Sequence, residues 1–147
     1  MDMRGLVEHL EACTVKVAAL PRAAADIAAP MMKETIKHEV MGSLTFLQTL
    51  APATQVDRVL NDFTPNDPLV RSGGLQSSVE ATAINAGEGE EAIAMAGTSD
   101  YRAKWLEYGT PNAQYPIPPR PAFMIGGLIV ADEMTPLFSN MAKTAVE

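Results

Sequence analysis

The side chains best suited to chemistry in this sequence are two histidines and one acidic cluster. His9 and His38 each stand beside a glutamate, but metal ligands on one helix face need a spacing of three or four residues. The acidic cluster is Glu88, Glu90 and Glu91, in an expected hairpin tip. Paired carboxylates perform acid–base catalysis in an enclosed pocket, which a solvated tip does not offer. We therefore expect no catalytic residue, no metal and no cofactor.

Other catalytic motifs are missing from the sequence. Gly73-Gly74 lacks the later Gly-Lys of a phosphate-binding loop, and no GxSxG nucleophile motif occurs. The single cysteine, Cys13, cannot form an internal disulfide, which fits a reducing cytoplasm. It lies on an apolar helical stripe, a position that favours a buried small hydrophobe over a reactive thiol. The sequence thus predicts a protein that is not an enzyme.

The charge balance limits the partners that we expect. The chain has 147 residues, a formal net charge of −7 and 47% hydrophobic residues. An acidic chain without a basic stripe does not grip a phosphate backbone, although it can sit beside DNA and let it slide past. No signal-peptide pattern opens the sequence, and the apolar run "PAFMIGGLIVA" is shorter than the ~20 residues that span a bilayer. We expect a soluble protein made in the cytoplasm, with no membrane partner.

The N-terminal part of the chain is expected to form helices, which would help to position any site. Apolar residues recur at helical spacing in residues 6–20 and again in 25–40, with Pro21 expected to end or kink the first helix or to start the next. Residues 42–53 fit either a short strand or a helical segment. Thr54 is a plausible N-cap for a short helix over residues 56–63.

The second half of the chain predicts a small sheet and a C-terminal helix. Alternation favours strands near residues 75–86 and 90–97, joined by a glycine-containing hairpin loop. "YRAKWLEYGT" favours a short helix that ends at Gly109, and the apolar run after Pro121 favours a helix that Pro136 breaks. We expect an α+β fold in one domain over residues 1–147, a small antiparallel sheet packed against long N-terminal helices (1–41) and a C-terminal helix. Residues 42–71 would form a variable connection and residues 72–147 the sheet, the proline-rich loop and that helix.

The proline-rich loop at residues 110–121 is the strongest candidate for function. Its prolines hold the backbone extended, so the loop loses less entropy when it docks. Apolar side chains and a multidentate arginine would then be offered to a partner, and Arg120→Glu would stop assembly without unfolding the monomer. The alternative is a stiff crossover in which Glu107 holds Arg120 inside the domain. The candidate interface residues are Trp105, Glu107, Tyr108, Thr110, Tyr115, Ile117, Arg120 and Phe123.

Three segments together resemble a known family. They are "SGGL" at residues 72–75, "YRAKWLEYGT" at 101–110 and "PPRPAF" at 118–123. Their order and spacing are similar to the tail-component family of long-tailed bacteriophages, the head–tail joining or tail-completion proteins. The likeness covers roughly residues 72–130. The sequence departs from the family's pattern at two places, and we expect both to affect docking contacts. Gly74 stands where the family usually has a basic residue, and Ala122 displaces Phe123 by one position.

The resemblance implies a structural virion protein at the neck of a tailed phage, assembled in the host bacterial cytoplasm. Its partners would be other copies of itself in a ring, expected to be a hexamer, and the adjacent neck and tail-tube proteins. DNA would pass through without specific binding, and the acidic hairpin tip could face that channel. Two alternatives stay open, a tail-tube terminator that caps the tube and a cellular adaptor domain.

Overall fold

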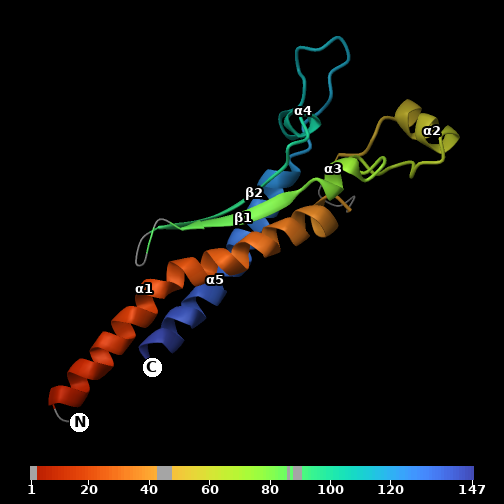
Figure 1. The fold of residues 1–147 in the computed structure, drawn as a ribbon. Helices are drawn as coiled ribbons and strands as arrows, with labels where there is room; N and C mark the ends of the chain where they lie inside the picture. The colour runs from red at the N-terminus through yellow and green to blue at the C-terminus, as the bar shows by residue number, and fades with distance from the viewer. Residues whose placement is uncertain (1–2, 43–47, 86, 88–90) are drawn as a thin grey trace.

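The computed structural model describes residues 3–42, 48–85, 87 and 91–147, and it is an α+β fold. A long N-terminal helix, α1 (Met3–Glu34), leads into a π-helix, η1 (Thr35–Val40). Figure 1 shows α1 running beside the C-terminal helix α5 (Ala122–Val146), with both chain ends at the same end of the molecule. We call α1, α5 and the β-hairpin the body. The predicted fold class is confirmed.

Pro136 does not break its helix as the sequence predicted, and of the three alternatives at Pro21 neither a helix end nor a new helix start is observed. Pro21 and Pro30 lie inside α1, and Pro136 lies inside α5. Each proline removes one backbone hydrogen bond, and that loss normally breaks a helix. Packing of α1 and α5 along each other stabilises both helices beyond their intrinsic propensity, so they continue through these positions. The end of the predicted N-terminal helical region, at residue 41, is close to the observed one, because η1 ends at Val40.

The core lies where η1 meets the start of α5. Ile36, Val40 and Met41 are almost fully buried, and the amide of Met41 donates to the carbonyl of Ile36 at 3.0 Å, the spacing of a π-helix. Gly126 of α5 faces Ile36 so closely that a Cβ there would lie 2.4 Å from Ile36 Cγ1. The glycine therefore lets the two helices approach each other.

The sheet is a two-stranded antiparallel hairpin that packs on α1. Strand β1 (Glu80–Asn85) pairs with β2 (Ala92–Gly97), from Glu80 opposite Gly97 to Asn85 opposite Ala92. The second strand agrees with the prediction, but the first does not start at residue 75. Residues Gly74–Ser77 form the helical turn α3 instead. The expected hairpin loop lies largely outside the described residues, including Glu88 and Glu90.

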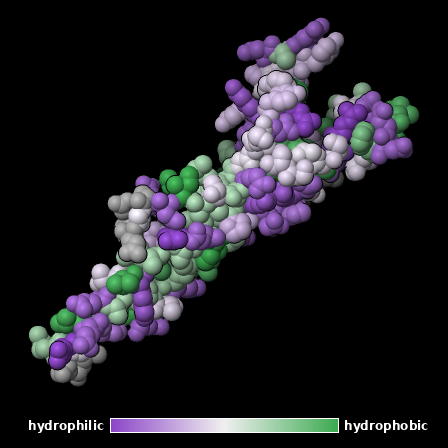
Figure 2. Space-filling view, viewed as in Figure 1, coloured by the Kyte–Doolittle hydropathy of each residue, from purple (hydrophilic) through white to green (hydrophobic). Residues whose placement is uncertain are grey.

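The connection between η1 and α3 contains one helix, α2 (Pro52–Leu60). The predicted N-cap at Thr54 is wrong, because Ala51 occupies the N-cap and Pro52 opens the helix. Within the stretch at 42–53, for which the sequence left strand and helix open, residues 43–47 lie outside the described residues. Residues 48–51 have no regular structure, and α2 begins at Pro52. At the end of the molecule that carries α2, hydrophilic colour dominates in Figure 2, whereas apolar residues are spread along the body.

Candidate functional site: the proline-rich loop and its base

Gly109 sets the direction in which the loop leaves the preceding helix. Helix α4 (Arg102–Tyr108) ends at Gly109, whose φ of 72° L side chains rarely adopt. A Cβ at this position would lie 2.7 Å from the carbonyl oxygen of Ile117. Both the backbone conformation and the close contact require glycine here, and the predicted helix end is confirmed.

Two hydrogen bonds close the loop at its base. The amide of Thr110 donates to the carbonyl of Ile117 at 3.0 Å, and the amide of Ile117 donates to Thr110 Oγ1 at 2.9 Å. Residues 111–117 are exposed beyond this closure, and Figure 1 shows the loop projecting from α4. Thr110, a predicted interface residue, thus fixes the loop internally. Tyr115 is 81% exposed at the projecting part.

Arg120 is not offered to a partner in the way that the sequence suggested. It is only 5% exposed, and its Nε donates to the carbonyl of Gln48 at 3.1 Å. Its backbone amide donates to the carbonyl of Leu106, which ties the end of the loop to α4. Burial lowers the pKa of Arg120, and the positive charge of Arg58 lowers that pKa further. Since a glutamate would be buried here, we now expect Arg120→Glu to disturb folding as well as assembly.

Glu107 does not pair with Arg120 either. Its Oε1 accepts the amide of Met124 at 2.8 Å and its Oε2 accepts the amide of Phe123 at 3.1 Å. These are first-turn amides of α5, which have no partner within their own helix. The carboxylate also carries the charge that the positive end of a helix dipole favours. Glu107 is therefore the cap of α5, supplied by α4.

We expect Glu107→Ala to lower the free energy of unfolding by about 1–2 kcal/mol, the usual effect of losing a helix cap. Glu107→Gln keeps one acceptor oxygen and is expected to lose less. Chemical denaturation of the whole chain measures both changes. Glu133→Ala, at an exposed position within α5, is the matched control and should change stability little. Equal effects at Glu107 and Glu133 would contradict the capping role.

Four exposed aromatic residues lie on α4, at its N-cap and on the loop. Tyr101, Trp105 and Tyr108 are spaced by four and three residues, so they share one helix face. The rings of Tyr101 and Trp105 meet edge to face, with centroids 5.2 Å apart. Together with Tyr115, these residues are all the tyrosines and the one tryptophan of the chain, and all four are exposed. We call this set the aromatic surface. The sequence interpretation omitted Tyr101, although its helical spacing from Trp105 was the available signal.

Of the two predicted interface residues not yet placed, one is exposed and the other is half-buried. Ile117 is exposed at the base of the loop, at 37%. Phe123 is half-buried and packs against the core cluster. The predicted set therefore contains an exposed part (Trp105, Tyr108, Tyr115 and Ile117) and an internal part that positions it (Glu107, Thr110, Arg120 and Phe123).

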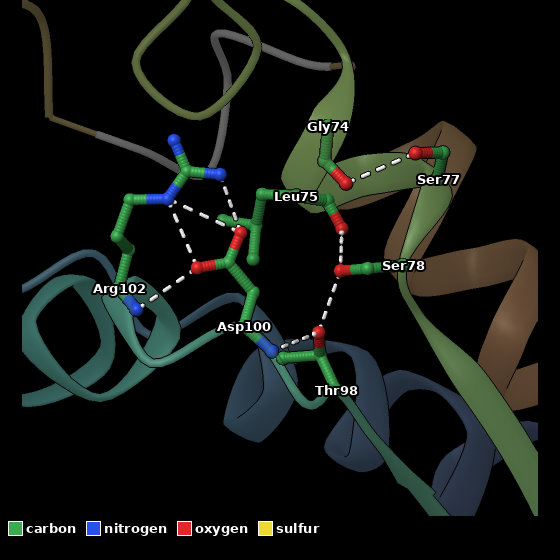
Figure 3. Close-up of polar contacts among 7 residues, drawn as sticks. All are labelled: Gly74, Leu75, Ser77, Ser78, Thr98, Asp100 and Arg102. Carbon is green, nitrogen blue, oxygen red and sulfur yellow. Dashed lines mark hydrogen bonds and ion pairs between the residues drawn. The ribbon is translucent and has the colours of Figure 1, made fainter.

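A polar cluster connects α4 to the start of the sheet. Ser78 Oγ and Thr98 Oγ1 lie 2.6 Å apart, and Thr98 Oγ1 accepts the amide of Asp100 (Figure 3). The Arg102 guanidinium donates to both carboxylate oxygens of Asp100, and it holds the pKa of Asp100 below its usual value. The first two of the three family-like segments thus meet at one place, around Gly74 and Arg102.

Within the described residues, no three His, Cys, Asp or Glu side chains gather as a metal site. Cys13 is half-buried, and its Sγ lies 3.6 Å from His9 Nε2, an i,i+4 contact that the sequence analysis did not consider. His38 pairs with Glu34 at 3.4 Å. Each of these two contacts joins only two side chains, which is fewer than a metal site needs. The expectation that the chain is not an enzyme stays a prediction.

No family model matches this chain, and neither does any curated protein or any solved structure.

Proposed function

We propose that this chain is a structural protein of a tailed-bacteriophage virion, which assembles as a ring at the neck between head and tail. The observation that carries the proposal is the aromatic surface, where every tyrosine and the tryptophan of the chain are exposed. Tyrosine and tryptophan are the residues most enriched at protein–protein binding hot spots. The resemblance of residues 72–130 to head–tail joining and tail-completion proteins is the reason for proposing a ring at the neck.

The construction of the loop supports a role in docking. The closure at Thr110 and Ile117 and the prolines beyond it hold Tyr115 in place before any partner arrives. Such pre-organisation reduces the entropy that binding costs. In a ring, one modest contact is repeated at every subunit boundary, so a weak pairwise interface gives a tight assembly.

The body offers a second surface on which a neighbour can pack. A groove of about 680 Å³ lies between α1, β2 and α5, lined mostly by small and apolar residues such as Ala28, Ala94 and Val130. The aromatic surface lies toward the other end of the molecule (Figure 1). A contact between two different surfaces of identical subunits is heterologous, and it produces a ring when the rotation closes.

Helix α5 itself is unusually apolar for its exposure. By length and composition this 25-residue helix could cross a membrane, because its most apolar 18-residue window has a mean hydropathy of 1.3, and only 17% of that window is buried. The shorter apolar run "PAFMIGGLIVA" does not by itself indicate this length. Asp132 and Glu133 lie within the helix, and a carboxylate in a bilayer core costs about 2.5–3.5 kcal/mol on insertion scales. We therefore assign the apolar surface of α5 to contacts with other protein subunits.

The test is an aromatic double variant of the purified chain, Tyr108→Ser with Tyr115→Ser. We expect the wild-type chain to form rings that are visible and countable by electron microscopy. The double variant should stay monomeric while its thermal unfolding temperature changes little, because both side chains are largely exposed. Val56→Ser with Val59→Ser, at exposed positions on α2, is the matched control and should still form rings. A wild-type chain that stays monomeric at every accessible concentration would refute ring assembly.

A further inference from the structure

A small cavity lined by arginines lies between α2, the segment before α3, and α4. Its volume is about 150 Å³, and its lining includes Arg58, Arg71, Arg102 and Ser72. Among the described residues that line it, none is an aspartate or a glutamate. A water molecule occupies about 30 Å³ of liquid, so the space suits a single compact ion with little water. Three arginines therefore line one small space in a chain whose net charge is −7.

Two of these arginines are held in place by carboxylates that lie outside the lining. Asp100 accepts from Arg102, whose guanidinium lies beside Gly74 (Figure 3). Asp57 lies 3.6 Å from Arg71 Nη2, and the Arg71 guanidinium stacks 4.9 Å from the centre of the Phe63 ring. These contacts fix the positions of the guanidinium groups. Since a guanidinium has five N–H donors, both arginines retain the capacity to donate to a further acceptor.

Arg58 adds a buried positive charge. It is 6% exposed, and its Nη1 donates to the carbonyls of Thr64, Asp67 and Val70. Its charge also acts on the buried guanidinium of Arg120. Within the part of the chain that the structure describes, neither Arg58 nor Arg120 makes an ion pair with a carboxylate at 4.0 Å or less. Buried charges are normally paired. The charge of Asp67 acts on Arg58, and Asp57 and Asp100 pair with Arg71 and Arg102. These three carboxylates offset part of the charge of the four arginines, and an anion would offset the remainder.

We propose that this cavity is a binding site for a compact tetrahedral oxyanion of the phosphate or sulfate type. Arginine is the side chain best matched to such ions, because its planar fork donates two parallel hydrogen bonds to two oxygens. Ser72 also lines the cavity, and a serine hydroxyl can serve as a neutral donor. Three guanidinium groups from separate segments surround a tetrahedral ion better than a planar monocarboxylate. The site would join α2 to α4 and so support the base of the aromatic surface, and it does not depend on ring assembly.

Isothermal titration of the whole chain with inorganic phosphate tests the proposal, with chloride used to keep the ionic strength constant. We expect saturable binding of one phosphate per chain. Arg71→Gln and Arg102→Gln should each weaken it about tenfold, because each removes a charge-assisted hydrogen-bond donor. Arg22→Gln is the matched control. Arg22 is an exposed arginine that also pairs with an aspartate, but it lies on α1 and should leave the affinity unchanged.

Arg58 is left out of these variants because its loss can unfold the surrounding segment. Far-ultraviolet circular dichroism must show that Arg71→Gln and Arg102→Gln remain folded, and Arg71→Lys keeps the charge as a second check. Acetate is the comparison anion. Absence of saturable phosphate binding would overturn the proposal, as would an equal loss in Arg22→Gln. Tighter binding of acetate than of phosphate would overturn the assignment to a tetrahedral ion.

Discussion

Replacing Arg58 with methionine is expected to lower the free energy of unfolding by about 3 kcal/mol, from three lost hydrogen bonds of a charged donor. Arg58 Nη1 donates to Asp67 at 2.6 Å and to Thr64 and Val70 at 3.3 Å, all through carbonyl oxygens. These bonds fold residues 64–70 around one buried side chain. Methionine preserves much of the apolar stem but leaves three carbonyls without that donor.

A second effect of the same substitution concerns Asp67. Burial raises the pKa of Asp67, while the amide of Val70 and the charge of Arg58 oppose that rise. Without Arg58 the pKa of Asp67 should rise further. Since a raised carboxyl pKa in the folded state favours the protonated form, the loss of stability in Arg58→Met should be smaller at acidic pH than at neutral pH.

Urea denaturation of the whole chain at one protein concentration measures these changes. Arg22→Met on the exposed side of α1 is the control, and we expect it to stay within about 0.5 kcal/mol of wild type. Arg58→Lys should recover part of the loss, because lysine keeps the charge but cannot reproduce the fixed geometry of the guanidinium. If Arg58→Met matched Arg22→Met, the three carbonyl contacts would have no structural importance.

Local chemistry made much of this fold predictable. The short helix at residues 102–108, its glycine end and the strand at 92–97 depend on neighbours in sequence, and the structure has all three. The start of the first strand was wrong for a reason that is also local. Leu75 and Val79 alternate as in a strand, but their spacing of four equally suits a helical turn. The hydroxyls of Ser77 and Ser78 then donate to the carbonyls of Gly74 and Leu75, which favours the turn.

The roles of Glu107 and Arg120 could not be predicted from their residue types. An acid and a base near one loop suggested a pair, yet each satisfies backbone groups instead. The amides at the start of α5 require an acceptor, and only the three-dimensional arrangement shows that α4 brings Glu107 to them. Likewise, the sequence pointed to Trp105, Tyr108 and Tyr115 as interface residues, but the exposure of the two residues on α4 depends on how that helix packs. The helix break predicted at Pro136 is wrong because tertiary packing outweighs the local rule.

The other large effect is expected where α5 crosses η1. A Cβ at Gly126 would lie 2.4 Å from Ile36 Cγ1 and 3.5 Å from Ile36 Cα. Ile36 is fully buried, so neither its side chain nor its backbone can move away freely. Gly126→Ala should therefore cost about 1–3 kcal/mol of stability through overpacking, even after the alanine improves helix propensity.

The adjacent glycine is the matched control, because the same substitution should have the opposite sign there. At Gly127 no atom of the described residues beyond the adjacent helix backbone lies within 4 Å of an added Cβ, so Gly127→Ala should raise the free energy of unfolding by up to ~1 kcal/mol through helix propensity. Thermal and urea unfolding of both variants, with the whole chain, measure the difference. A double-mutant cycle then locates the clash: with Ile36→Ala already present, Gly126→Ala should lose most of its cost. If both glycine variants shifted stability in the same direction, the close approach of η1 and α5 around Gly126 would not exist in solution. The packing of the core around Ile36 in solution would then differ from the packing described above.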